Sequence, residues 1–318
     1  MTTTLKSIKN VMFKGVKMRV LLMGGTRFIG RHVCGKLIAH GHEVICFHRG
    51  KTLGIPGTDA KYINGDRRTK DIQKIAELKP EYVIDLSAYH PDDIRDLITV
   101  MGKCVKRYIF CSSAAVYDEM IDNPIYETDA TKKYELTTRG EDYAVNYASN
   151  KLGCELEVKK LARQYKFEYV ILRPAIVYGQ YDYTERLAYW VRRVRSGVVK
   201  VPGDGMGIVR MVYVEDLAEA FVTAMTSDKA KNKTYNIADE GIFSLKEIIE
   251  AIVKVMDVHA EVKQLSPDEM KERGSMVESF PLCYQRHAIV DITAARNDLG
   301  YKSTPFREAL KKTIATIK

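Results

Sequence analysis

The sequence predicts an α/β fold, a doubly wound parallel sheet with a smaller C-terminal α/β lobe. Two observations lead to this prediction. From residue 19 to about residue 175, short apolar runs alternate with helical patterns, which is typical of parallel strands joined by right-handed crossovers. In addition, the glycine-rich segment GGTRFIG at 24–30 lies between the first strand and the first helix, where a βαβ unit makes a tight turn.

The predicted strands are short apolar runs, and the predicted helices have apolar residues at helical spacing. Strands are expected at 19–23, 43–47, 61–63, 82–86, 107–111 and 168–172. Helices are expected from the glycine turn to Gly41, with Ile29, Val33 and Leu37 on one face, and at 70–78, 92–102 and 140–165.

The alternation of strands and helices breaks after about residue 175. The sequence that follows predicts a basic helix at 184–195, helices at 217–226, 245–256 and 305–317, a strand at 233–237 that could rejoin the sheet, and a polar loop region at 265–285. We therefore expect three parts: a flexible extension at 1–17, a nucleotide-binding domain made of 18–175 with about 211–237, and a substrate-binding lobe made of about 176–210 with 238–318.

The composition excludes a disordered chain, because 46% of the residues are hydrophobic. The formal net charge of +9 suggests nucleic-acid binding. Residues 1–17 contain four lysines and no acid, which leaves 46 basic and 41 acidic residues in the rest of the chain. This mild excess suits an anionic small molecule, so nucleic acid is not the expected partner.

Targeting and membrane segments are not predicted. The longest run without Asp, Glu, Lys or Arg is 108–117, which is too short to span a membrane. Residues 1–17 lack the apolar region of a secretory signal and contain no Arg, so a disordered extension is favoured over an organelle presequence. The cysteines show no metal-ligand spacing, and we expect no metal site and reduced thiols in a cytoplasmic protein. They are Cys34, Cys46, Cys104, Cys111, Cys154 and Cys283.

The glycine turn predicts a site for the pyrophosphate of a dinucleotide. Backbone N–H groups at such a turn and at the start of the helix hold phosphate oxygens. Arg27 stands where the usual pattern has its middle glycine, and a guanidinium can bind a phosphate through two hydrogen bonds. The predicted contacts in this segment are Gly24, Thr26, Arg27, Phe28, Ile29 and Gly30.

The residues after the second strand favour NADP over NAD. An acidic residue there would bind the ribose hydroxyls of NAD, but the sequence has His48, Arg49 and Lys51, which suit a 2′-phosphate. Asp66, after the third strand, is placed to meet the adenine amino group. The remaining predicted cofactor contacts are Arg67, Leu86, Ser87, Ala88, Cys111, Pro174 and Ile176.

Tyr147 and Lys151 form the predicted catalytic pair. In YASNK they are four residues apart, so a helix places them on one face. An ammonium beside a phenol favours the phenolate and lowers the pKa of the phenol from about 10. Such a tyrosine can take a proton from an alcohol while a hydride moves to a nicotinamide, or run the reverse. Ser112 and Ser113 end the fifth strand, at the edge of a parallel sheet where ligands bind.

Seven segments together resemble the extended short-chain dehydrogenase/reductase superfamily, specifically its NAD(P)-dependent epimerase/dehydratase group, over about residues 18–302. They are GGTRFIG, the NGD of Asp66, CSSAAVY, YASNK, LRPAIVYG, VRMVYVEDLAEA and DITAARNDLGY. The resemblance implies a Rossmann-like fold and a homodimer that uses the helix bearing Tyr147.

The resemblance also implies the roles of four residues. Ser113 would hydrogen-bond the reacting oxygen, Tyr147 would be the acid/base, Lys151 would also hold the nicotinamide ribose, and Arg210 would bind a substrate phosphate. The predicted substrate contacts are Ser112, Ala115, Tyr178, Arg186, Trp190 and Arg210.

Departures from the group's patterns narrow the expected function. Ala114 and Ala115 stand where sugar-nucleotide 4,6-dehydratases carry Asp-Glu, which argues against that reaction. Ile176 stands where sugar-nucleotide epimerases usually have an Asn that binds the diphosphate. The sequence therefore predicts an epimerase or oxidoreductase acting on a hydroxyl or keto carbon of a sugar, sugar nucleotide or similar anionic metabolite. An NADPH-dependent ketoreductase and a non-catalytic RNA-binding or cofactor-sensing relative remain as alternatives.

The predicted basic helix offers a candidate anion site. Residues 186–200 contain five cations and no acid, and Arg186, Tyr189, Trp190 and Arg193 share one helical face. Such a face could bind a phosphate and a flat base. The alternative is that the two aromatic residues pack the lobe while the arginines are solvated.

Overall fold

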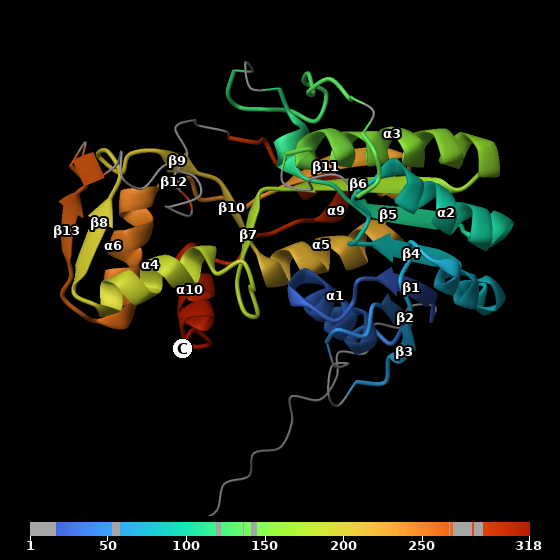
Figure 1. Ribbon diagram of the computed structural model, residues 1–318, viewed down its shortest axis with the longest axis horizontal. Helices are drawn as coiled ribbons and strands as arrows, with labels where there is room; N and C mark the ends of the chain where they lie inside the picture. Colours follow the sequence, from blue (N-terminus) through green and yellow to red (C-terminus); the bar gives the residue numbers. More distant parts are fainter. Residues whose placement is uncertain are drawn as a thin grey trace, which may run out of the picture.

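Seven parallel strands form the central sheet of the computed structural model, in the order β11-β6-β5-β4-β1-β2-β3 (Figure 1). The order steps outward from β1 in both directions, which makes the sheet doubly wound, with its switch point between β1 and β4. The strands are β1 Arg19–Met23, β2 Glu43–His48, β3 Lys61–Asn64, β4 Tyr82–Asp85, β5 Arg107–Cys111, β6 Glu168–Pro174 and β11 Lys233–Ile237.

The structure describes residues 17–52, 58–118, 122–135, 137–140, 145–266, 268–269, 282 and 289–318. Nearly all of the predicted extension at 1–17 and most of the predicted loop region at 265–285 lie outside the described residues. The predicted α/β class with a doubly wound parallel sheet is confirmed. The strand predicted at 233–237 does rejoin the sheet, because β11 pairs in parallel with β6. No helix within the described residues is long and apolar enough to cross a membrane.

Helices cover both faces of the sheet (Figure 1). Side chains alternate along β1, so Val20 and Leu22 pack on the side of α1 and α5, whereas Leu21 and Met23 pack on the side of α2 and α3. All four side chains are buried, so the sheet is apolar on both faces, as doubly wound sheets require. The covering helices are α1 Phe28–Ala39, α5 Val214–Thr226, α2 Pro91–Met101 and α3 Tyr147–Tyr165.

Two predicted helices differ from the structure. Of the helix expected at 140–165, the structure describes α3 from Tyr147 to Tyr165. Gly140 has a φ of +102°, outside the right-handed helical region, and residues 145–146 form a turn, so these residues are not part of the helix. The segment at 70–78 is a 3-10 helix, η1 Lys70–Leu78, with Thr69 as its N-cap. The other predicted helices agree with the structure to within three residues at each end, and the helix at 245–256 has the predicted bounds.

A second lobe packs around its own apolar cluster at one end of the molecule (Figure 1). Trp190 is fully buried in this cluster. The expectation that Trp190 contacts substrate is therefore corrected: its indole fills the lobe core. The lobe contains α4 Arg186–Arg195, α6 Leu245–Met256, α10 Phe306–Ile314, the parallel pair β8 Val198–Val201 and β13 Glu261–Gln264, and the antiparallel pair β9 Ile208–Val209 and β12 Phe243–Ser244.

Short elements join the sheet to this lobe. Strand β7 pairs in parallel with β10 directly after β6, so the chain leaves the central sheet there. Ser244 begins α6 with a capping box, since its Oγ accepts from Glu247 N while the Glu247 carboxylate accepts from Ser244 N. The remaining elements are β7 Ile176–Tyr178, β10 Met211–Tyr213, α9 Thr293–Leu299, η2 Gly102–Cys104, η3 Ala114–Val116 and η4 Asp228–Ala230.

A buried ion pair lies under the carboxyl end of the sheet. Asp85, the last residue of β4, is fully buried and accepts two hydrogen bonds of 2.8 Å from the Arg67 guanidinium. The Tyr108 hydroxyl and the Ser87 backbone N–H also donate to this carboxylate. Arg67 further donates to Asp93 O at 2.6 Å. The prediction that Arg67 contacts the cofactor is thus corrected, because its guanidinium is turned inward to Asp85.

We predict that Asp85→Asn lowers the free energy of unfolding by about 3–5 kcal/mol, because it leaves the Arg67 charge buried without its counter-ion. Urea unfolding measures the change. Glu43→Ala is the control, since Glu43 pairs with Arg19 at 3.1 Å on the surface and its loss should cost less than about 1 kcal/mol. Equal effects of the two substitutions would contradict the prediction.

Candidate functional site

The glycine turn, the end of β2 and the segment after β4 meet at the carboxyl edge of the sheet. Gly24 has a φ of +90°, and its N–H donates to Phe47 O at 3.1 Å. A Cβ at Gly24 would lie 3.1 Å from the Cβ of Ser87. Gly24 therefore needs to be glycine for its conformation and for this close approach.

The turn fits the pyrophosphate of a dinucleotide. A Cβ at Gly30 would lie 2.0 Å from Gly24 O, so α1 packs directly on the turn. Arg27 is the N-cap of α1, and its side chain makes no hydrogen bond to the first N–H groups of the helix. These N–H groups are the donors that bind a phosphate at a helix start.

Arginine–tyrosine stacks join the start of α1 to the segment after β7. The Arg27 guanidinium lies 3.9 Å from the ring centroid of Tyr183, and the Arg31 guanidinium lies 4.2 Å from that of Tyr181. Phe28 packs in the apolar cluster of the second lobe. The predicted cofactor residues Arg27 and Phe28 thus also hold the turn against the lobe.

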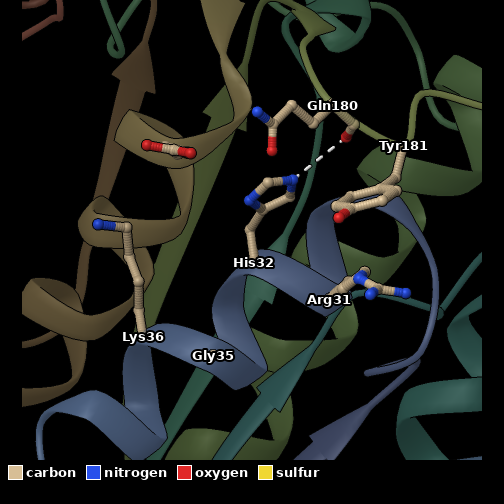
Figure 2. A pocket seen from close by; sticks show the side chains of 7 residues that line it. Arg31, His32, Gly35, Lys36, Gln180 and Tyr181 are labelled. Carbon is tan, nitrogen blue, oxygen red and sulfur yellow. Dashed lines mark hydrogen bonds between the residues drawn. The ribbon is translucent and has the colours of Figure 1, made fainter. Parts of the chain in front are cut away.

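A shallow groove of about 370 Å³ lies beside the stack of Arg31 on Tyr181 (Figure 2). His32 forms a hydrogen bond of 3.1 Å to Gln180 O, and burial lowers the pKa of this imidazole. A Cβ at Gly35 would meet nothing within 4 Å, so this part of α1 is open. The groove is lined by Arg31, His32, Gly35, Lys36, Gln180, Tyr181 and Glu215.

The two cations after β2 lie on the surface. Arg49 and Lys51 are exposed, and neither forms an ion pair with a described residue. The Thr26 hydroxyl hydrogen-bonds the Thr52 hydroxyl at 2.6 Å, which ties the glycine turn to this segment. Asp66 is half-buried, and one of its carboxylate oxygens accepts from Arg68 N at 2.9 Å.

Lys151 is almost fully buried, and its ammonium joins the end of β5 to the segment after β4. Its Nζ donates to Ala88 O at 3.0 Å and to Cys111 O at 2.8 Å. Nζ lies 6.0 Å from the ring centroid of Tyr147. Burial alone would lower the pKa of Lys151, but the phenols of Tyr147 and Tyr89 and nearby thiols raise the pKa above its usual value. The lysine is therefore charged at neutral pH.

The other two predicted catalytic residues, Tyr147 and Ser113, are half-buried. Tyr147 is half-buried and is the first residue of α3. Ser113 is half-buried, and its Oγ accepts from Ala115 N at 3.2 Å as the N-cap of η3. Because η3 contacts α3, the structure brings the segments of all three residues together.

Two predicted substrate contacts lie in the interior instead. The Ser112 hydroxyl donates to Glu155, whose buried carboxylate also pairs with Arg173 at 2.7 Å. The Tyr178 hydroxyl donates to Asp239 at 2.9 Å, and burial raises the pKa of Asp239 to about 7. Both predictions are corrected, because strand alternation turns these hydroxyls toward buried carboxylates.

The two predicted substrate arginines are mostly enclosed. Arg186 is half-buried and donates to the Thr184 hydroxyl at 3.1 Å. Arg210 is buried and donates to backbone oxygens, the shortest bond being 2.7 Å to Gly241 O. Its Nε has no hydrogen-bond partner among the described residues. Ala115, the remaining predicted contact, is exposed.

Sequence reasoning missed Tyr89. This half-buried tyrosine follows the predicted contact Ala88 directly, and its ring lies closer to the Lys151 ammonium than the ring of Tyr147 does. Its place just beyond a strand end was the only signal in the sequence.

Residues 20–238 match the NAD dependent epimerase/dehydratase family, and this match covers more than half of the chain. The chain belongs to this family. Membership in the NAD dependent epimerase/dehydratase family confirms the predicted resemblance and an NAD(P)-dependent enzyme with epimerase or oxidoreductase activity.

The proteins that are similar to this chain differ in their named activities. A chloroplast stem-loop binding protein of 41 kDa from Arabidopsis thaliana is 27% identical over 302 residues, which cover 89% of this chain and 75% of the relative. A 2-alkyl-3-oxoalkanoate reductase from Stenotrophomonas maltophilia is 23% identical, and the match covers 82% of this chain and 82% of the reductase. The structure of a UDP-glucose 4-epimerase from Thermotoga maritima, with UDP-glucose, has a TM-score of 0.76 and 25% identity. The match covers 94% of this chain and 98% of the epimerase chain.

We predict that Gly30→Ala weakens cofactor binding at least tenfold, because the new methyl would lie 2.0 Å from Gly24 O and would displace the turn from α1. Equilibrium titration with NADPH and NADH, followed by the fluorescence of the reduced nicotinamide, measures the affinity. Gly35→Ala on the same helix is the matched control, since its methyl meets nothing. If both variants bind cofactor like the natural chain, the turn is not the pyrophosphate site.

Proposed function

We propose that this enzyme transfers a hydride between NADP(H) and a hydroxyl or keto carbon of an anionic small molecule, such as a sugar or sugar nucleotide. The observation that supports this most directly is the buried, charged Lys151 beside Tyr147, at the edge of the sheet that also carries the glycine turn. A charged lysine and a partly open phenol at this edge are the groups that proton transfer beside a dinucleotide requires.

Three side chains would handle the proton. Tyr147, as phenolate, would take the proton of the substrate hydroxyl, and as phenol it would return the proton to a carbonyl oxygen. Lys151 favours the phenolate because an ammonium near a phenol stabilises its charged form. Ser113 would donate a hydrogen bond to the reacting oxygen. The bound nicotinamide supplies or accepts the hydride.

We predict that Tyr147→Phe lowers the rate of hydride transfer by about 10²–10⁴-fold, because no group of suitable pKa remains to move the proton. Absorbance of the reduced nicotinamide measures the transfer. Tyr165→Phe, at the far end of α3, is the control and should react like the natural enzyme. A Tyr147→Phe variant that keeps more than a tenth of the rate would overturn the assignment of the acid/base.

The preference for NADP rests on the cations after β2. Arg49 and Lys51 are exposed and free of ion pairs with described residues, so a 2′-phosphate could bind them without breaking existing contacts. A charge-assisted hydrogen bond to a phosphate is stronger than a neutral one. No carboxylate occupies 48–51 to bind the ribose hydroxyls of NAD.

We predict that the double change Arg49→Ala and Lys51→Ala weakens NADP binding at least tenfold and leaves NAD binding within twofold. The reason is that both cations would contact only the 2′-phosphate. Calorimetric titration with each dinucleotide measures both affinities. Lys61→Ala, at the amino end of β3, is a control for loss of positive charge. Equal weakening of the two dinucleotides, or none, would refute the NADP preference.

The substrate would bind through arginines at the junction with the second lobe. Arg186 is half-buried, and Arg210 Nε has no hydrogen-bond partner among the described residues, so each can contribute to binding a phosphate or carboxylate. Whether the overall reaction is epimerisation or net reduction follows from the fate of the dinucleotide. An epimerase regenerates it in each turnover, whereas a ketoreductase consumes NADPH in equal amount to product.

A second candidate function is binding of a nucleic-acid stem-loop. It is favoured by the similarity over 89% of the chain to the Arabidopsis stem-loop binding protein. Exposed Arg27, next to the ring of Tyr183, offers a phosphate contact beside an aromatic face. Stem-loop RNA binding that weakens steeply with salt, together with the absence of hydride transfer, would favour this function over the first.

The expected homodimer would use the outer face of α2 and α3. Leu156 on α3 is 48% exposed, and Glu157 forms an ion pair with Arg95 of α2 beside it. A face with an exposed leucine and a charged rim is suited to a second copy. Light scattering on the natural chain and on Leu156→Asp would show whether a dimer forms and depends on this face.

A further inference from the structure

Two tyrosine rings, not one, face the ammonium of Lys151. Nζ lies 4.4 Å from the ring centroid of Tyr89 and 6.0 Å from that of Tyr147. The two ring centroids are 6.4 Å apart. The phenol ring nearest to the buried cation therefore belongs to Tyr89, a residue outside the Tyr-x-x-x-Lys pair.

The position of Tyr89 is fixed by buried neighbours. Its backbone N–H donates to Asp93 at 2.9 Å, and the same carboxylate binds the Arg139 guanidinium at 2.6 Å. The preceding carbonyl, Ala88 O, accepts from Lys151 Nζ. The peptide unit between Ala88 and Tyr89 is thus anchored at both its carbonyl and its N–H, which fixes where the Tyr89 side chain begins, close to the ammonium.

The distance to Tyr89 is that of a cation–π interaction. A cation within about 6 Å of a ring centroid is attracted to the ring, and the attraction is strongest where water is excluded. Lys151 is 2% exposed, so it is such a case. Two of the three N–H groups of Lys151 are committed to Ala88 O and Cys111 O, and rings of Tyr89, Tyr147 and Phe110 surround the charge.

We propose that Tyr89 is a positioning residue of the active site, whose ring holds the Lys151 ammonium and thereby sets the ionisation of Tyr147. This proposal rests on the proposed function of Tyr147. Lys151 stabilises the phenolate of Tyr147 only while it is charged and held in place. Without the ring of Tyr89, the ammonium loses a favourable contact, and its field at Tyr147 weakens.

The other titratable groups around Lys151 do not replace this contribution. Cys111 on β5 and Cys154 on α3 both act on its charge. Burial raises the pKa of Cys111 to about 11 and raises that of Cys154 further, so both thiols are neutral at physiological pH. Asp85 acts on both thiols, and Asp93 acts on Cys154. Of the groups that act on the ammonium, this leaves the phenols of Tyr147 and Tyr89.

The test is a titration of Tyr147 that needs no substrate. The ultraviolet absorbance of phenolate is followed against pH, and the difference between the natural chain and Tyr147→Phe isolates Tyr147. The same difference is then measured in a Tyr89→Leu background, with and without Tyr147→Phe. We expect the pKa of Tyr147 to rise by about one unit, a tenfold loss of phenolate below that pKa.

Matched variants identify which part of Tyr89 matters. Tyr89→Phe keeps the ring and is expected to keep the pKa of Tyr147, whereas Tyr89→Met, which fills similar space without a ring, should shift it as Tyr89→Leu does. Tyr169→Leu, a half-buried tyrosine near the opposite end of the sheet, should titrate like the natural chain. An unchanged pKa in folded Tyr89→Leu and Tyr89→Met, or an equal shift in Tyr89→Phe, would overturn the proposal.

The pH dependence of hydride transfer gives an independent measurement. In Tyr89→Leu, the rise of kcat/KM with pH in the oxidation of a hydroxyl should move upward by the same unit. If Tyr147→Phe transfers hydride normally, the proposed function fails whatever Tyr89 does. If Tyr147→Phe is inactive but Tyr89→Leu does not shift the profile, only the role of Tyr89 fails.

Discussion

The buried ammonium of Lys151 is the constraint on which the site depends. A charge inside a protein is tolerated only when hydrogen bonds and favourable contacts replace water. Here Ala88 O, in the segment after β4, and Cys111 O, at the end of β5, accept from Nζ. The lysine therefore ties α3 to the end of β5 and to the segment after β4. In the proposed function, the groups that stabilise its charge would also surround the reacting atoms.

A second set of buried charges links the segments that meet at the same edge of the sheet. Asp85 ends β4 and binds Arg67, and Arg67 also donates to Asp93 O at the start of α2. The carboxylate of Asp93 in turn binds Arg139, which precedes α3. Rigid charge pairs thus connect a strand end, a helix start and the segment that leads to Tyr147. Arginine suits these positions because its fixed fork of donors satisfies several acceptors at once.

The sequence predicted the sheet because its signals are local, whereas several site residues depend on packing that no local pattern reports. Apolar runs and the glycine turn were enough for the strand positions and for the parallel sheet. Ser112 and Ser113 differ only in which way the strand end turns them, and the buried Glu155 that decides it is 43 residues away. The sequence likewise left open whether Trp190 is a surface or a core residue, because α6 and β8, which pack against α4, are separate segments of the chain. The NADP preference and the catalytic roles remain predictions.

The turn explains why the middle glycine of the dinucleotide pattern can be an arginine here. Gly24 has a φ of +90°, and Gly30 has no room for a Cβ, so geometry demands glycine at both. Arg27 has φ −125° and ψ 148°, which is extended backbone that any residue adopts. Its exposed side chain stacks on Tyr183. The side chain at this position is therefore accommodated by the segment after β7, which shields the start of α1 on that side. A glycine there would give up this link between the turn and the second lobe.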